Sequence, residues 1–153
     1  MTPEEKLEEL GIQLPEVPKP LGSYAPCIRI GNLIYLSGLL PLKGGKLLKT
    51  GKVGKSVTID EAIKCAETVV INALAVLRSA IGSLESVKRC ITISGYVSST
   101  DDFNDQPKVM NGASDLIFKV FGEAGRHSRT AVGVNVLPLN SPVEIAFIFE
   151  VEA

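Results

Sequence analysis

Residues 125–153 read GRHSRTAVGVNVLPLNSPVEIAFIFEVEA and place two arginines and the only histidine of the chain just before two apolar segments. The second segment alternates, so one face of a strand carries only apolar side chains: Val143, Ile145, Phe147, Phe149 and Val151. The prolines and polar residues between the two segments are typical of a turn. We therefore expect residues 129–136 and 143–151 to pair as a hairpin.

The expected pairing sorts the side chains of this hairpin into two faces. One face joins Thr130, Val132, Val134 and Val136 to the apolar face of the second strand, beneath the helices. The other face carries Arg129, Ala131, Gly133, Glu144, Ala146 and Ile148. Because a sheet face of small residues invites a second sheet against it, we predict self-association through this face. An ordinary solvated sheet face is the alternative.

Arg129 and Glu144 lie far apart in such a hairpin. Glu144 pairs near Asn135, which leaves roughly 20 Å along the strand to Arg129. A small-molecule site that uses both residues therefore requires either strong coiling of the sheet or a neighbouring subunit.

Helices and short strands alternate upstream of this hairpin. Residues 58–61, TIDE, form a capping box that begins a long helix, and Gly82 ends it. A second helix is expected within residues 101–121. Gly31-Asn32 joins two short strands, and residues 87–99 form another. This order predicts an α+β fold in which a mixed, mostly antiparallel sheet carries two helices on one face.

The first twenty residues differ from the rest of the chain. Thr2-Pro3-Glu4-Glu5 is a capping box that begins a short helix, and the prolines of QLPEVPKP then keep the chain extended. We interpret residues 1–20 as an arm packed on a single domain of residues 21–153. The lysines of residues 43–55 indicate a solvated edge.

Composition and charge exclude several classes of protein. Sixteen basic and seventeen acidic residues nearly cancel, so no basic surface indicates a nucleic acid or an anionic membrane as partner. The apolar runs fall short of the ~20 residues of a membrane span. Three scattered cysteines are typical of free thiols in a reducing cytoplasm, which we predict as the location. One histidine and no CxxC motif argue against a metal site.

Among the residues considered on their chemistry alone, Arg129 is the best candidate for a ligand-binding residue. Its planar guanidinium binds carboxylates through two parallel hydrogen bonds, and the small residues Ala131 and Gly133 beside it leave room for a ligand. A structural ion pair at a subunit boundary explains an arginine at this position equally well. His127 is interpreted as a loop residue near a helix end, since no GxSxG motif presents a serine to it.

Four stretches resemble the YjgF/RidA family, also labelled L-PSP endoribonuclease-like, over residues 21–153. LGSYAPCIRIGNLIYLSGLLPL is similar to its opening hairpin, VMNGASDLIF to its asparagine helix, SRTAVGVNVLP to its arginine strand and SPVEIAFIF to its last strand. The family's functional positions then fall on Tyr24, Ser37, Gly38, Asn111, Arg129 and Glu144. Glu144 follows Arg129 by the family's own separation.

The resemblance implies a chorismate-mutase-like fold and a homotrimer whose sheets form a central barrel with ligand clefts between subunits. It also implies hydrolysis of reactive enamine or imine intermediates, such as 2-aminoacrylate, to a 2-keto acid and ammonia. No cofactor and no metal is expected, because an imine is already electrophilic.

The resemblance further implies a role for each matched position. Arg129 holds the substrate carboxylate and Glu144 positions or activates the attacking water. Backbone N–H groups near Gly38 and Ala131 complete the contacts to the anion. Tyr24, Ser37 and Asn111 line the cleft, whereas without the resemblance Tyr24 would cap a hairpin and Asn111 would face solvent. The sequence departs from the family at Ala131, often cysteine, and at Ala146, often a second acid.

Two other functions compete with the deaminase. The first is a non-catalytic binder or sensor of small carboxylates such as 2-keto acids, which uses the same arginine. The second is the endoribonuclease of the family label, which the neutral charge balance disfavours.

Overall fold

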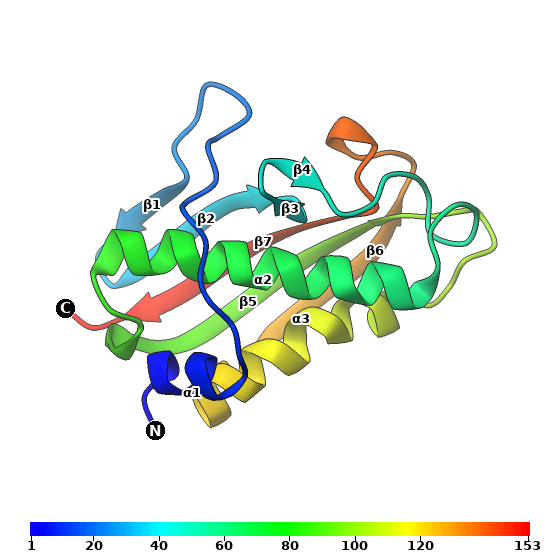
Figure 1. The fold of residues 1–153 in the computed structure, drawn as a ribbon. Coiled ribbons are helices and arrows are strands. Elements are labelled where there is room, and N and C mark those ends of the chain that lie inside the picture. Colours follow the sequence, from blue (N-terminus) through cyan, green and yellow to red (C-terminus); the bar gives the residue numbers. More distant parts are fainter.

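A five-stranded mixed sheet forms the centre of the computed structural model, which describes residues 1–153 (Figure 1). Its strands, in spatial order, are β1 (Cys27–Ile30), β2 (Leu33–Leu39), β7 (Val143–Val151), β5 (Val87–Ser98) and β6 (Ser128–Val134). Only the β5–β6 pair is parallel; the other neighbours are antiparallel. β3 (Leu42–Lys43) and β4 (Lys46–Leu47) form a separate small hairpin, so the lysine-rich stretch is not an edge of the main sheet.

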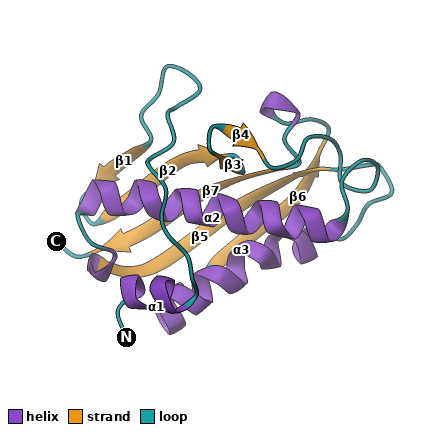
Figure 2. Ribbon diagram, viewed as in Figure 1, coloured by secondary structure: helices purple, strands orange, loops and turns teal.

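The helices are α1 (Pro3–Glu9), α2 (Ile59–Ile81) and α3 (Gln106–Phe121), and α2 and α3 lie on the same face of the sheet (Figures 1 and 2). Short 3₁₀ turns occupy Leu84–Ser86, Gly122–Gly125 and Pro138–Asn140. Both expected capping boxes, at Thr2 and Thr58, are present. The predicted α+β fold with its two long helices on one face is confirmed. None of the helices combines the length and the hydropathy that a transmembrane segment requires.

The core lies between the sheet and the two long helices. The five apolar side chains of β7 named above are buried, while the residues between them are only half-buried, as the alternation predicted. Leu7 of α1 belongs to the same apolar cluster, and the segment after α1 runs across α2 (Figure 1). The arm therefore contributes to the core of the domain.

The predicted closing hairpin is wrong. β6 pairs with β5, where Arg129 lies opposite Ile93, and β7 lies on the other side of β5, where Glu144 lies opposite Tyr96. The physical reason is the helix between β5 and β6. A strand–helix–strand connection returns the chain beside its first strand in parallel, so the turn after β6 has to carry the chain across the sheet instead of closing a tight hairpin.

The predicted faces of β6 are therefore reversed. Residues opposite one another share a face, so Arg129, Ile93 and Phe147 point toward the helices. Glu144, Tyr96 and Val132 point away from them. Ala131 packs against the core and Val132 is 41% exposed, the opposite of the expectation. Arg129 and Glu144 do not share a face.

The sheet face turned away from the helices is partly apolar. Ile28, Tyr35 and Ile148 follow one another across β1, β2 and β7 on this face, and Ile28 and Tyr35 are 54% and 42% exposed. Ala146 and Ile148 belong to this face as predicted, whereas Ala131 and Gly133 do not. We call Ile28, Tyr35, Val132, Ala146 and Ile148 the open sheet face.

Candidate functional site

The guanidinium of Arg129 lies between β6 and α3. Its Nη1 donates hydrogen bonds to Asn111 Oδ1 at 2.9 Å and to Ser114 Oγ at 3.1 Å. Asn111 and Ser114 are three residues apart on α3 and so lie on one face of that helix. Although Asn111 is exposed, it does not simply face solvent, because its side chain fixes the arginine. Both partners are neutral, so no carboxylate of the chain pairs with Arg129.

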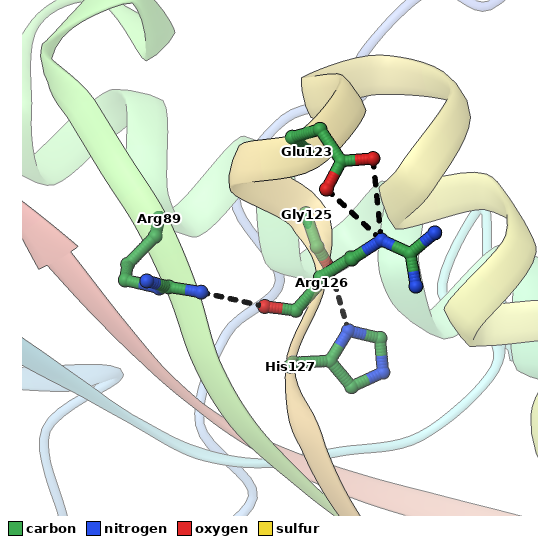
Figure 3. A network of polar contacts seen from close by, with 5 residues as sticks. All are labelled: Arg89, Glu123, Gly125, Arg126 and His127. Atoms are coloured by element: carbon green, nitrogen blue, oxygen red, sulfur yellow. Dashed lines mark hydrogen bonds and ion pairs between the residues drawn. The ribbon is translucent and has the colours of Figure 1, made fainter.

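His127 extends the same cluster. Its Nε2 lies 2.9 Å from Ser114 Oγ and its Nδ1 lies 2.6 Å from the carbonyl oxygen of Gly125 (Figure 3). A pocket of about 390 Å³ is lined by Ser114, Asp115, Phe118, Gly125, Arg126, His127 and Arg129. We call Asn111, Ser114, His127 and Arg129 the arginine cluster. Ser114 was not predicted as a site residue, and its only signal in the sequence is its position about one helical turn after Asn111.

Arg126 stands on the rim of this pocket and is held by other groups. Its Nε donates to the Glu123 carboxylate at 3.0 and 3.2 Å, and its guanidinium lies 5.6 Å from the centre of the Phe118 ring. Arg89 Nη2 on β5 donates to the Arg126 carbonyl at 3.2 Å (Figure 3). Through these contacts Arg126 orders the turn between α3 and β6 at the rim of the pocket.

Four other expected site residues gather elsewhere, around a pocket of about 480 Å³. Tyr24, Ser37, Gly38 and Glu144 line it together with Leu21, Leu40 and Pro138. The Tyr24 hydroxyl accepts from the Leu21 backbone N–H at 3.1 Å, and Ser37 Oγ donates to the Ala25 carbonyl at 2.6 Å. The loop before β1 is thereby fixed against β2. We call Tyr24, Ser37, Gly38 and Glu144 the glutamate cluster.

Gly38 makes room for the carboxylate of Glu144. The pairing of β2 with β7 is irregular between Leu36 and Leu39, and at this bulge the backbone of Gly38 approaches Glu144 closely. A Cβ atom on Gly38 would lie 2.5 Å from Glu144 Oε2. Burial raises the pKa of the Glu144 carboxyl above its ordinary value of 4.5. The carboxyl thus holds a proton more readily than a solvated glutamate does.

The two clusters do not meet within one chain. Tyr96 of β5 lies opposite Val132 on one side and opposite Glu144 on the other, so Val132 is the residue of β6 that is level with Glu144. Val132 is three positions along β6 from Arg129. The two backbones are therefore separated by about 10 Å along the strands and by about 10 Å across them, and the side chains leave opposite faces. Ala131 lies on the helix side with Arg129. The arginine cluster and the glutamate cluster are therefore separate groups within one chain, each at its own pocket.

A family model, curated proteins and solved structures all match this chain over most of its length. A family model described as "YjgF/chorismate mutase-like, putative endoribonuclease" matches residues 4–151. Protein TCP17 of Trypanosoma cruzi is 38% identical over 145 residues, which cover 94% of this chain and 91% of that protein. A 2-iminobutanoate/2-iminopropanoate deaminase of Dermatophagoides farinae is 28% identical over 92% of this chain and 95% of its own length. The crystal structure of Atu1372 from Agrobacterium tumefaciens, a protein of unknown function, superposes with a TM-score of 0.92 at 42% identity, covering 99% of this chain and 93% of that one.

Proposed function

This chain belongs to the YjgF/chorismate mutase-like family, and on that premise we propose that it hydrolyses reactive enamine or imine intermediates of the 2-aminoacrylate type. The products are a 2-keto acid and ammonia. One observation carries the proposal: Arg129 is held at a pocket by neutral acceptors alone, through Nη1 only. Its Nε and Nη2 are free to bind a carboxylate through two parallel hydrogen bonds.

The relative from Dermatophagoides farinae supports this substrate class. Its name describes the deamination of 2-iminobutanoate and 2-iminopropanoate, which are small imines that carry a carboxylate. Such an imine needs no cofactor, because its carbon is already electrophilic. Water adds to that carbon, the C–N bond of the resulting carbinolamine breaks, and ammonia leaves.

The separation of the arginine cluster from the glutamate cluster supports a homotrimer with its reaction clefts at the subunit boundaries. In this assembly the open sheet faces of three copies pack together around a central barrel. The glutamate cluster of one protomer then faces the arginine cluster of another. Arg129 binds the carboxylate, Asn111 and Tyr24 line the cleft, and Glu144 positions or activates the water. Backbone N–H groups near Gly38 and Ala131 complete the contacts to the anion.

A second function, a non-catalytic binder of small carboxylates, is favoured by one observation. Arg129 and its partners are complete within one protomer, whereas Glu144 is not beside them. Binding of a carboxylate therefore needs only the arginine cluster. Turnover distinguishes the two functions. Cleavage of RNA that is lost on changing Arg129 would instead support the endoribonuclease of the family description.

A coupled assay tests the deaminase. A serine or threonine dehydratase generates the imine in situ, and release of the 2-keto acid is followed with wild type, Arg129→Ala and Arg126→Ala. We expect acceleration by wild type and Arg126→Ala, and loss of at least about 30-fold in Arg129→Ala, since losing one partner of a buried charged contact costs ~2–5 kcal/mol. Full activity in Arg129→Ala contradicts the proposal. If wild type binds the 2-keto acid pyruvate but does not accelerate its release from the imine, the result favours the non-catalytic binder of small carboxylates.

A further inference from the structure

A large cavity lies beneath the N-terminal arm, apart from both clusters described above. Its volume is about 800 Å³, within the range of small-molecule sites. The residues that line it lie within residues 11–21 of the arm, 42–45 of the β3–β4 hairpin and 68–72 of α2. The arm crosses α2 here (Figure 1). We call this cavity the arm pocket. No member of the arginine cluster or of the glutamate cluster lines it.

Asn72 of α2 brings a buried hydrogen-bond acceptor to the arm pocket. Asn72 is only 3% exposed, and its Nδ2 donates to the carbonyl oxygens of Leu40 at 3.2 Å and Leu42 at 2.9 Å. These bonds use both N–H groups and fix the orientation of the amide, so Oδ1 is the polar atom left for the pocket.

This oxygen has no donor within the chain, yet it stays accessible. Asn72 takes part in hydrogen bonds only through Nδ2. The one side-chain nitrogen or oxygen that is fully enclosed without a partner is Glu4 Oε2, so Asn72 Oδ1 still has contact with the open space of the pocket. Because buried polar groups are almost always paired, an N–H group of a ligand is the partner that this oxygen lacks.

Two cations stand at the same pocket without a partner of opposite charge. Lys19 belongs to the arm and Lys43 to β3, and neither takes part in an ion pair of the chain. Lys43 directly follows Leu42, whose carbonyl oxygen holds Asn72, so a cation and the free amide oxygen are close neighbours. An anionic group beside an N–H donor therefore matches this end of the pocket.

The remaining wall of the arm pocket is largely apolar. Its apolar side chains are Ile12, Val17, Leu21, Leu42 and Ile71. A ligand that fills the pocket thus combines a donor, an anion and an apolar body. A 2-amino acid carries its ammonium and its carboxylate on one carbon, and the volume of the pocket leaves room for a large side chain.

We infer that the arm pocket binds a 2-amino acid with a large apolar side chain. Its carboxylate pairs with Lys19 and Lys43, and its ammonium donates to Asn72 Oδ1. Its side chain packs against the apolar wall. This site is separate from the proposed deamination and does not depend on it. Since α2 lies on the helix side of the sheet, packing of the open sheet faces leaves α2 uncovered.

Equilibrium dialysis of the full chain against radiolabelled phenylalanine tests the site. We expect saturable binding in wild type and the same affinity in Arg129→Ala, because the arginine cluster is a different place. Absence of saturable binding overturns the inference. Loss of binding in Arg129→Ala does so too, since it places the amino acid at the arginine cluster.

Competition by matched analogues tests each contact. Compared with phenylalanine, 3-phenylpropanoate lacks the ammonium, 2-phenylethylamine lacks the carboxylate and alanine lacks the ring. Each should bind at least about tenfold more weakly, because each loses either a charged hydrogen bond or the burial of an aromatic side chain. An affinity of 3-phenylpropanoate equal to that of phenylalanine contradicts the role of Asn72 Oδ1 and overturns the inference.

Variants of exposed lysines locate the site without disturbing the core. The double variant Lys19→Gln/Lys43→Gln should bind phenylalanine at least about tenfold more weakly. Lys46→Gln is the matched control, because Lys46 lies opposite Lys43 in the hairpin but does not line the pocket. Equal binding by the double variant and the control overturns the inference. Deamination is measured separately, so failure of the deaminase leaves this site standing, and failure of the site leaves the deaminase standing.

Discussion

Arg129 and Glu144 leave opposite faces of one sheet, from strands that are separated by β5. Arg129 points toward α3, where neutral side chains hold it, and Glu144 points away from the helices beside Gly38. A single protomer cannot bring both side chains to one small imine. If the proposed deamination uses both side chains, two copies of the chain have to bring them together.

Complementation between variants tests the shared cleft. Arg129→Ala and Glu144→Ala are each expected to be inactive alone. Coexpressed so that they assemble at random, they should form mixed trimers with roughly a third of wild-type activity, because one of the three boundaries in each mixed trimer joins an unaltered Arg129 to an unaltered Glu144. The measurement is 2-keto acid release by mixed assemblies purified through two different tags. A mixed assembly as inactive as either parent would show that both residues act within one protomer or that one of them is dispensable.

The open sheet face should be the surface of self-association. Val132→Lys places a charge on this face, and we expect a shift from an oligomer to monomers in light scattering, because burying an unpaired charge is costly. Leu10→Lys on the helix side is the matched control, since Leu10 and Val132 are 38% and 41% exposed. Dissociation by Leu10→Lys with an intact Val132→Lys oligomer would place the interface on the helix side.

Gly38→Ala should lower the stability of the fold because the added methyl group would collide with the side chain of Glu144. The added Cβ would lie 2.5 Å from Glu144 Oε2, so the carboxylate or the β2 bulge must shift. We expect a loss of about 1–3 kcal/mol in the free energy of unfolding, as in other overpacked sites. Urea denaturation of the double-mutant cycle with Glu144→Ala checks the cause. The cost of Gly38→Ala should largely disappear when the carboxylate is gone; an equal cost in both backgrounds would point to the backbone instead.

The stability of the protein should depend on pH through Glu144. Burial raises the pKa of its carboxyl in the folded chain above the ordinary value of 4.5. Folding therefore penalises the charged form, and the penalty appears as pH rises above 4.5 through the folded pKa. Glu144→Gln should be more stable than wild type at pH 7 and equal to it at pH 3.5. Urea denaturation at the two pH values measures this, and a variant less stable at pH 7 would show that the carboxylate is stabilised by contacts other than solvent.

Several elements could be predicted because their causes lie within a few residues. The Thr58–Glu61 capping box, the end of α2 at Gly82 and the turn at Gly31 each depend on hydrogen bonds or φ angles local to the chain. The alternation of apolar and other residues in β7 likewise predicts which of its side chains are buried. These patterns were sufficient for the α+β class. Arg129 and Glu144 were located as site residues by the resemblance of four stretches of the sequence to the YjgF/RidA family.

The pairing of strands and the neighbours of Arg129 were decided only by the tertiary structure. Whether β6 joins β5 or β7 depends on the direction in which α3 returns the chain, and residue alternation is the same in both cases. Because β6 pairs with β5, Arg129 points toward Asn111 and Ser114, whereas Glu144 points from the sheet face that is turned away from the helices. The sequence by itself determined which segments are helices and strands, because those preferences are local. The tertiary structure decided which side chains share a site, because contacts between distant segments depend on the path of the whole chain.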